Sequence, residues 1–315
     1  MQSYLARRLL TLPLLLLAIS IISFTLLNLA PGDPAYSILR DRQGGEEPAP
    51  KDVLALREKL RLDDPVVLRY GRWLLGAAQG DLGVSYRGGQ PIMRELWQRL
   101  PATLMLAGAA LLLAIAMGVP LGVGAALRRG SLTDGLSRLL ALVGAAVPSY
   151  MLALLLMLLF SVTLNWLPAI GYGSPKHLVL PAIALALGSS APLMRLSRAS
   201  MLEVLQQDYV RTARAKGLNE RVVIRVHALK NALLPVVTVL GINLGHLLGG
   251  TVIVESIFNW PGVGKYAVDA IFLRDFPVIQ GFVLYMGLIF LIVNLTVDLS
   301  YRWLDPRLHF GGQPS

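Results

Sequence analysis

Basic side chains crowd into one stretch of an otherwise apolar sequence, between Asp208 and Asn231. They fall within a few helical turns, as Arg211, Arg214, Lys216, Arg221, Arg225 and Lys230. Such a stretch can bind three kinds of surface: nucleic acid, anionic lipid, or an acidic groove on another protein. Gly217 is typical of a helix end and Asn219 of a helix start, so the stretch predicts a helix–turn–helix.

Small residues among the charges separate these three chemistries. Thr212, Ala213, Ala215 and Gly217 alternate with the basic residues. A helix that lies on lipid needs large apolar side chains on one face, whereas small residues let another backbone come close. A DNA-binding module has a similar outline, but this stretch joins two apolar segments without a linker that could release it. The pattern favours a short helix that fits a groove on a partner protein; a solvated basic loop is the alternative.

The remaining sequence is typical of a membrane protein. Of 315 residues, 55% are hydrophobic and 15% are charged, whereas charged residues make up about a quarter of a soluble domain. A helix needs about 20 mainly apolar residues to cross a bilayer. Six segments are candidates, of which the fourth is the weakest because it is short and contains two prolines: residues 9–29, 103–127, 139–164, 178–193, 233–254 and 278–297.

The distribution of Lys and Arg decides whether the fourth segment crosses. Basic residues precede the first segment and follow the second, and a large group lies between 195 and 230. If all six segments cross, each of these groups lies on the cytoplasmic side, as the positive-inside rule requires. We therefore expect an all-α polytopic membrane protein with six transmembrane helices and with both termini in the cytoplasm.

This topology divides the chain into four predicted parts. Residues 1–30 form a cytoplasmic N-terminus and the first span, and residues 31–101 form an extracytoplasmic segment. Residues 102–302 form a five-helix core that contains the cytoplasmic loop 195–231, and residues 303–315 form a cytoplasmic tail. In the second part, "PKDVLALREKLRL", "DDPVVLRYGRWLLGAAQGDLG" and "QPIMRELWQRLP" each predict a short helix. The segment is either a packed cap or a docking element for something that arrives from outside.

The fifth apolar segment carries a second group of candidate residues. Gly241, Gly245 and Gly249 recur every four residues, which allows close helix packing, either inside this chain or against another subunit. Asn243 and His246 are polar groups in the same span, and such groups either pair across helices or face a pathway. We identify no catalytic residue and no metal site, since the four histidines are scattered and Cys is absent. "PGVGKY" lacks the first Gly and the Ser or Thr of a phosphate-binding loop.

Several motifs resemble one family in the same order along the chain. "DYVRTARAKGL" with "HALKNALLPVVT" resembles the cytoplasmic EAA-type loop of ABC importer permeases, in the form typical of the dipeptide, oligopeptide and nickel group. "LAPGDPA", "GDLGVSYRGGQPI", "RLPATL", "VESIFNWPGVGKYAVDAI" and "NLTVDLSYRWLDPR" extend the resemblance over almost the whole chain. It is similar to the first, B-type permease subunit of such importers. One departure, Arg211-Thr212-Ala213 in place of Glu-Ala-Ala, is usual for this group.

The resemblance implies a type I ABC importer permease fold in a bacterial inner membrane and a non-catalytic role. It implies a second permease subunit, two cytoplasmic ATPase subunits and an extracytoplasmic solute-binding protein as partners, and no nucleic acid. No cofactor is expected on this chain, because ATP and Mg²⁺ would bind the ATPase subunits. The implied coupling residues are Asp208, Tyr209, Arg211, Thr212, Ala213, Arg214, Ala215, Lys216 and Gly217.

The expected cargo is a dipeptide or an oligopeptide, with glutathione-like compounds or nickel chelates as alternatives. An ion-coupled secondary transporter is a further alternative, but it needs ionisable groups within the membrane, of which this chain has few.

Overall fold

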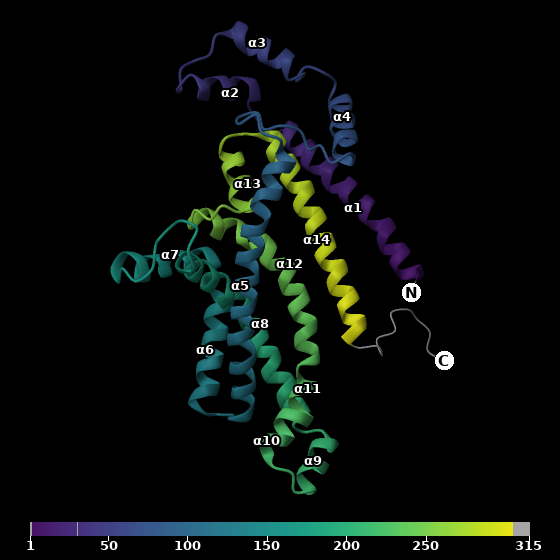
Figure 1. Cartoon of the computed structure of the whole chain (residues 1–315), viewed down its shortest axis with the longest axis vertical. Helices are drawn as coiled ribbons and strands as arrows, with labels where there is room; N and C mark the ends of the chain where they lie inside the picture. The colour runs from purple at the N-terminus through teal and green to yellow at the C-terminus, as the bar shows by residue number, and fades with distance from the viewer. Residues whose placement is uncertain (1, 30, 305–315) are drawn as a thin grey trace. The chain divides into compact units, whose positions relative to one another are not determined.

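Helices make up the described part of the chain, residues 2–29 and 31–304 of a computed structural model (Figure 1). Within these residues a single isolated bridge, Val84 to Pro91, is the only strand-type pairing. The all-α prediction is confirmed. The elements are α1 (Gln2–Leu29), α2 (Pro34–Arg42), α3 (Pro50–Lys59), α4 (Val66–Ala78), α5 (Ile92–Leu127), α6 (Leu132–Ala146), α7 (Ser149–Leu156), η1 (Met157–Thr163), α8 (Pro175–Val204), α9 (Asp208–Ala215), α10 (Glu220–Val222), η2 (Val223–Ala228), α11 (Leu229–Ala232), α12 (Leu234–Ile257), α13 (Val263–Phe272) and α14 (Phe276–Leu304).

Five stretches in the described residues are long and apolar enough to cross a membrane, and a bent pair makes a sixth if it is one span. The five are Thr11–Leu29, Ile92–Leu127, Pro175–Val204, Glu220–Gly245 and Phe276–Val297. The bent pair is α6 with α7 and η1, at an angle of 108°. The number agrees with six predicted spans, including the weak fourth one. The fifth span along the chain differs from the prediction, because it covers Glu220–Gly245 instead of residues 233–254 and includes part of the basic stretch.

The third span is not the continuous helix that the sequence predicted over residues 139–164. The helix stops at Ala146, and Val147 adopts an extended conformation with φ −95° and ψ 121°. Pro148 follows, and a proline disfavours the helical conformation of the residue before it. A second helix starts directly after this proline, at Ser149, in a new direction.

Contacts divide the chain into two compact units. Unit 1 comprises Met1–Pro101 with Gly262–Ile292, and unit 2 comprises Ala102–Pro261 with Val293–Ser315. The helices α5 and α14 pass from one unit to the other. The four sequence ranges predicted above stay a prediction, since the division by contacts groups residues 262–292 with the N-terminal part.

In unit 1, α3 begins at Pro50 as the sequence predicted, but "QPIMRELWQRLP" is not a separate short helix. It is the first part of α5, a helix of 36 residues that continues through Pro101. Ile92, Leu96 and Leu100 lie on one helical face, and all three are buried in the core of unit 1. Burial of this face stabilises the helix more than the backbone hydrogen bond lost at the proline destabilises it.

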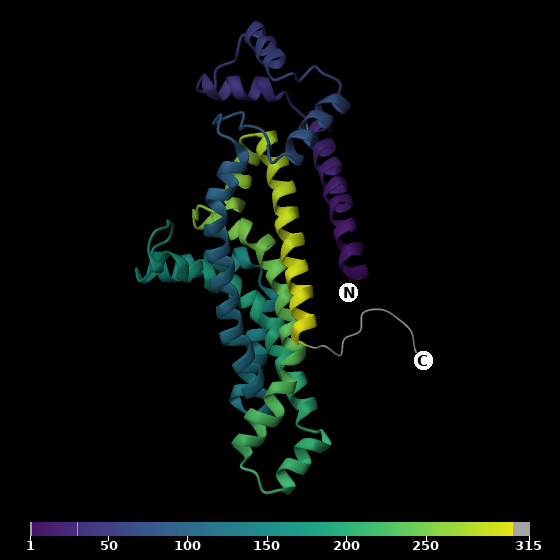
Figure 2. The same cartoon turned by 45° about the vertical axis from the view of Figure 1, so that its right-hand side comes forward.

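In unit 2, α5, α6 and α8 run side by side in both views (Figures 1 and 2). Glycines allow the close approach. A Cβ atom added to Gly122 of α5 would lie 2.5 Å from the carbonyl oxygen of Met194 in α8. At Gly118, one turn earlier, an added Cβ atom would lie 2.8 Å from Cβ of Leu193. On α6, Gly144 meets the backbone of α8 in the same way, at the carbonyl of Leu187. These three glycines therefore set the spacing of the bundle.

Candidate functional site

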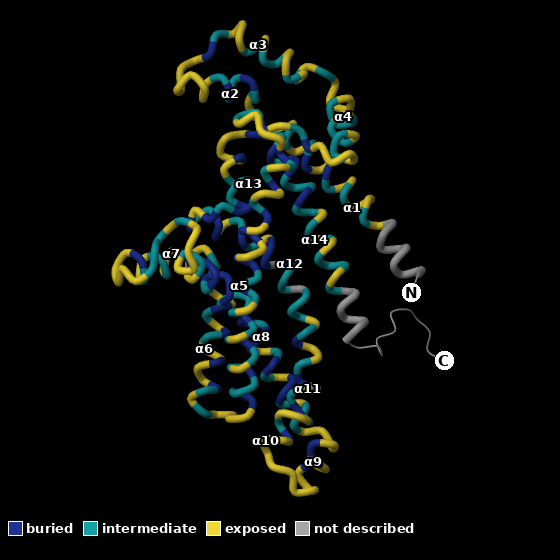
Figure 3. Tube along the Cα trace, in the orientation of Figure 1, coloured by how far each residue is buried: buried dark blue, intermediate teal, exposed yellow. Residues whose placement is uncertain are grey.

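The basic stretch folds as α9, a turn, α10, η2 and α11, at one end of unit 2 (Figure 2). One face of α9 is buried within the loop itself, because Val210 and Ala213 pack against Val223 of η2. Figure 3 shows this alternation of buried and exposed positions along α9. The loop thus has a small core of its own, which holds the short helix in place.

In the turn after α9, Gly217 and Asn219 have the conformation and the capping role that the sequence predicted. Gly217 adopts φ +76°, the left-handed region that favours glycine. The side chain of Asn219 accepts a hydrogen bond from the backbone N–H of Arg221 at 3.0 Å and caps the next helix. The predicted helix–turn–helix is confirmed.

An ion pair closes this turn from the outside. Arg214 donates to both carboxylate oxygens of Glu220, at 2.7 and 3.1 Å. Hydrogen bonding to this carboxylate raises the pKa of the Arg214 guanidinium above its ordinary value. The guanidinium is therefore already occupied within the loop.

The face of α9 opposite the loop core is exposed, and we call it the docking face: Asp208, Arg211, Thr212 and Ala215. Tyr209, Lys216 and Gly217 flank it and are also exposed. The hydroxyl of Tyr209 accepts a hydrogen bond from Asn231 Nδ2 at 3.0 Å, which connects α9 to α11. Of the predicted coupling residues, Ala213 thus lies in the loop core and the others lie on the surface.

The loop packs against the longer helices of unit 2. Ala228 of η2 and Ala232 of α11 form a buried cluster with Met201 of α8 and Ala126 of α5. Alanine side chains bring these backbones close together, and a close-packed interface transmits displacement. The second half of the loop, η2 and α11, is therefore in direct contact with the ends of α5 and α8.

A second link between α6 and α8 was not found by sequence reasoning. The Asp134 carboxylate, at the start of α6, is fully buried and accepts hydrogen bonds from Arg198 of α8 at 2.9 and 3.3 Å. Arg138 and the backbone N–H of Gly130 also donate to it. The spacing of Asp134 and Arg138 is a local signal in the sequence, but nothing local pairs Asp134 with Arg198, 64 positions away.

The candidates in the fifth span lie on α12, apart from the loop. Gly245 is buried, whereas Gly249 is exposed and an added Cβ atom there would meet open space. The Nδ2 atom of Asn243 is buried and has no hydrogen-bond partner among the described residues. His246 lies outside the described side chains. The predicted packing and pathway roles stay predictions.

The loop core makes a direct prediction for two alanines on the same helix. Ala213→Trp places a large ring where 6% of the residue is exposed, so the loop opens. Ala215→Trp adds the same ring to the exposed face and leaves the core intact. In membranes treated with trypsin, we expect faster cleavage after Arg211, Arg214 or Lys216 in Ala213→Trp only. Equal cleavage in both variants would contradict the burial of Ala213.

The fold and the site together define a polytopic helical membrane protein with a basic loop rooted in its spans. Two family models match nearly the whole chain. Residues 118–310 match the binding-protein-dependent transport system inner membrane component, and residues 1–107 match the N-terminal part of such components. The chain belongs to this family, the permeases of ABC importers.

Relatives match along nearly the full length of the chain. The chain is 42% identical over 338 residues to the dipeptide transport system permease protein DppB of Alkalihalophilus pseudofirmus, covering 98% of this chain and 100% of the relative. It is 39% identical over 310 residues to the glutathione transport system permease protein GsiC of Salmonella paratyphi A, covering 98% and 100%. It is 43% identical over 303 residues to a putative peptide transport system permease protein of Brucella suis biovar 1, covering 94% and 95%.

Among solved structures, an inward-facing conformation of the MetNI methionine ABC transporter is similar in fold. The TM-score is 0.58 at 18% identity, over 69% of this chain and 99% of the solved chain. This likeness shows the fold of a type I ABC importer permease, as the sequence predicted.

Proposed function

We propose that this chain is one half of the membrane pathway of an ATP-driven importer for dipeptides or oligopeptides. Family membership implies ATPase and solute-binding partners. We further propose that the second half is a different permease subunit, that both termini are cytoplasmic, and that ATP and Mg²⁺ bind the ATPase subunits alone. The dipeptide and peptide permeases among the relatives support the cargo.

The exposed docking face of α9 is the observation that carries the mechanism. A short helix whose outer face consists of Asp208, Arg211, Thr212 and Ala215 offers two charges and two small residues to a groove. Small residues allow close approach, and the charges set orientation. α9 packs on the end of α8, and η2 and α11 of the same loop pack on α5 and α8. Closure of the ATPase subunits would therefore pull these helices and switch the pathway between its two sides.

Glutathione is the second candidate cargo, because a glutathione permease matches the chain over its full length. It is a tripeptide-like molecule and would use the same machinery. Competition for uptake separates the two. In a peptide importer, unlabelled dipeptide should inhibit the uptake of labelled peptide. In a glutathione importer, only glutathione should inhibit the uptake of the labelled substrate.

The test of the mechanism is a matched pair of exposed alanines. Ala215 lies on the docking face, and Ala199 is exposed on α8 outside it. In Ala215→Trp, the ring fills the space that a partner helix or groove would occupy. We expect the ATPase subunits to be lost on purification from membranes and uptake of labelled peptide to fall at least about tenfold, the result of losing ~1.4 kcal/mol of binding.

Ala199→Trp is the control and should keep both the ATPase subunits and peptide uptake. If Ala215→Trp retains its ATPase subunits and transports as the unchanged protein does, α9 is not the docking element. Uptake that persists after ATP depletion would instead favour an ion-coupled transporter.

A further inference from the structure

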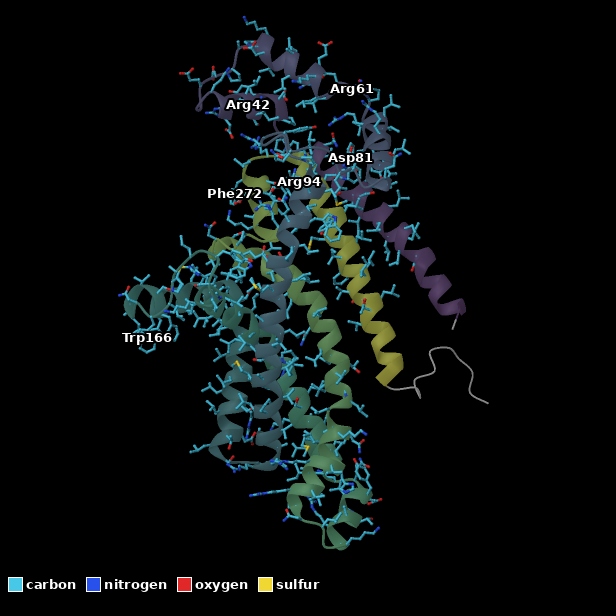
Figure 4. All side chains as sticks on the ribbon, viewed as in Figure 1. Arg42, Arg61, Asp81, Arg94, Trp166 and Phe272 are labelled. Carbon is cyan, nitrogen blue, oxygen red and sulfur yellow. The ribbon has the colours of Figure 1, made fainter. Side chains whose placement is uncertain are left out.

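A cavity of about 580 Å³ lies within unit 1, where α1 ends and the helices α2 to α4 follow. Its wall has an apolar part and a cationic part. Phe24 and Leu27, from the last turns of α1, belong to the apolar part. The basic side chains in the wall come from α3, α4 and the segment between them, where Figure 4 labels Arg61: Arg57, Lys59, Arg61, Arg69 and Arg72.

Acidic groups neutralise only part of this charge. Arg57 pairs with Asp33 at 2.7 Å and with Asp63 at 2.5 Å, and Arg72 pairs with Asp64.

Three basic side chains of the wall take no part in these ion pairs. For Lys59, Arg61 and Arg69, the described residues supply no carboxylate within ion-pair distance. Arg69 makes one long hydrogen bond, at 3.4 Å, to the carbonyl oxygen of Leu62. The wall therefore carries an excess of positive charge at one place.

A further hydrogen-bond donor lies in the same wall. Trp73 lines the cavity, and its Nε1 atom is buried without a hydrogen-bond partner in the described part of the chain. An indole N–H can only donate. A buried donor of this kind is rare in a folded protein unless a ligand or water supplies an acceptor. That atom has no accessible surface, so the negative charge expected of a ligand follows from the three cations and not from the indole.

The position of the cavity favours lipid over a soluble anion. In the apolar stretch Thr11–Leu29 of α1, only 6% of the residues are buried inside the protein. The surface of this stretch is therefore available to lipid. Phe24 and Leu27 lie near its end, where the hydrocarbon gives way to the head groups. We propose that this cavity binds the phosphate group of an anionic phospholipid through Lys59, Arg61 and Arg69, with the acyl chain along the apolar wall. The proposal rests on α1 crossing the membrane, but not on the docking of α9.

The test uses the full chain with the subunits that co-purify with it, in nanodiscs of phosphatidylcholine or of phosphatidylcholine with phosphatidylglycerol. Mass spectrometry of the intact complex measures the phosphatidylglycerol that stays bound. We expect retention to fall about fivefold in Arg61→Gln and further in Arg61→Gln/Arg69→Gln, since each basic residue near a head group contributes about that factor.

Lys51→Gln is the matched control, because Lys51 is an exposed lysine on α3 that does not line the cavity. It should retain phosphatidylglycerol as the unchanged protein does. Thermal unfolding in pure phosphatidylcholine should be the same for all variants, which separates lost binding from misfolding. Equal retention in Lys51→Gln and in the double variant would overturn the proposal.

A second arm distinguishes lipid from a soluble phosphate. Glycerol 3-phosphate is added to the complex in pure phosphatidylcholine. If it binds as well as phosphatidylglycerol does, and is lost in the double variant, the site serves a soluble anion and the lipid assignment is overturned. If the double variant still co-purifies with its ATPase subunits, its loss of ligand binding does not come from a failure of the coupling loop.

Discussion

Gly122→Ala should destabilise the protein by about 1–3 kcal/mol, although it adds a single methyl group. The added Cβ atom would lie 2.5 Å from the carbonyl oxygen of Met194 and 2.8 Å from Cβ of Ser197. Neither neighbour is the flexible end of a side chain, so α5 and α8 must move apart. We also expect weaker transport, because α8 leads into the loop that carries α9.

Gly124→Ala is the control on the same helix. An added Cβ atom there meets nothing within 4 Å, and alanine is a better helix former than glycine by about 0.5–1 kcal/mol. Denaturation in SDS, followed by a spectroscopic probe, should therefore show a loss for Gly122→Ala and no loss, or a gain, for Gly124→Ala. Equal effects of the two substitutions would show that α5 and α8 are not in close contact at Gly122.

Asp134→Ala should lower the thermal unfolding temperature by several degrees and weaken transport. The carboxylate has no exposed surface, and it connects Arg198 of α8 to the start of α6. Its removal breaks the link between the two helices and takes an acceptor from the backbone N–H of Gly130. Charge-assisted hydrogen bonds of this kind are stronger than those between neutral groups.

Arg138→Ala tests how specific this effect is. The Arg138 side chain is 63% exposed, and exposed ion pairs contribute little, so its loss should change the unfolding temperature only slightly. A double-mutant cycle of Asp134→Ala and Arg198→Ala should show strong coupling, with the double variant little worse than Asp134→Ala. Additive losses would mean that the two side chains do not stabilise each other.

Sequence patterns predicted the features that depend on neighbouring residues. The lengths of the apolar segments predicted the spans, and Gly217 with Asn219 predicted the turn. The bend at Pro148 also has a local cause, the effect of proline on the residue before it. It was not predicted, because the apolar pattern of residues 139–164 is continuous across this proline. The separate short helix predicted for "QPIMRELWQRLP" was wrong, because burial of Ile92, Leu96 and Leu100 keeps it continuous with the next span.

The sequence by itself determined the class of protein, the apolar stretches that can cross a membrane and the position of the basic loop along the chain, because these follow from local hydropathy, backbone preference and charge. Only the tertiary structure decided which groups meet: that Gly118 and Gly122 contact α8, that Ala213 faces the loop core while Ala215 faces outward, and that Asp134 pairs with Arg198. A contact between distant residues depends on how helices pack in space, and no local pattern in the chain specifies that packing.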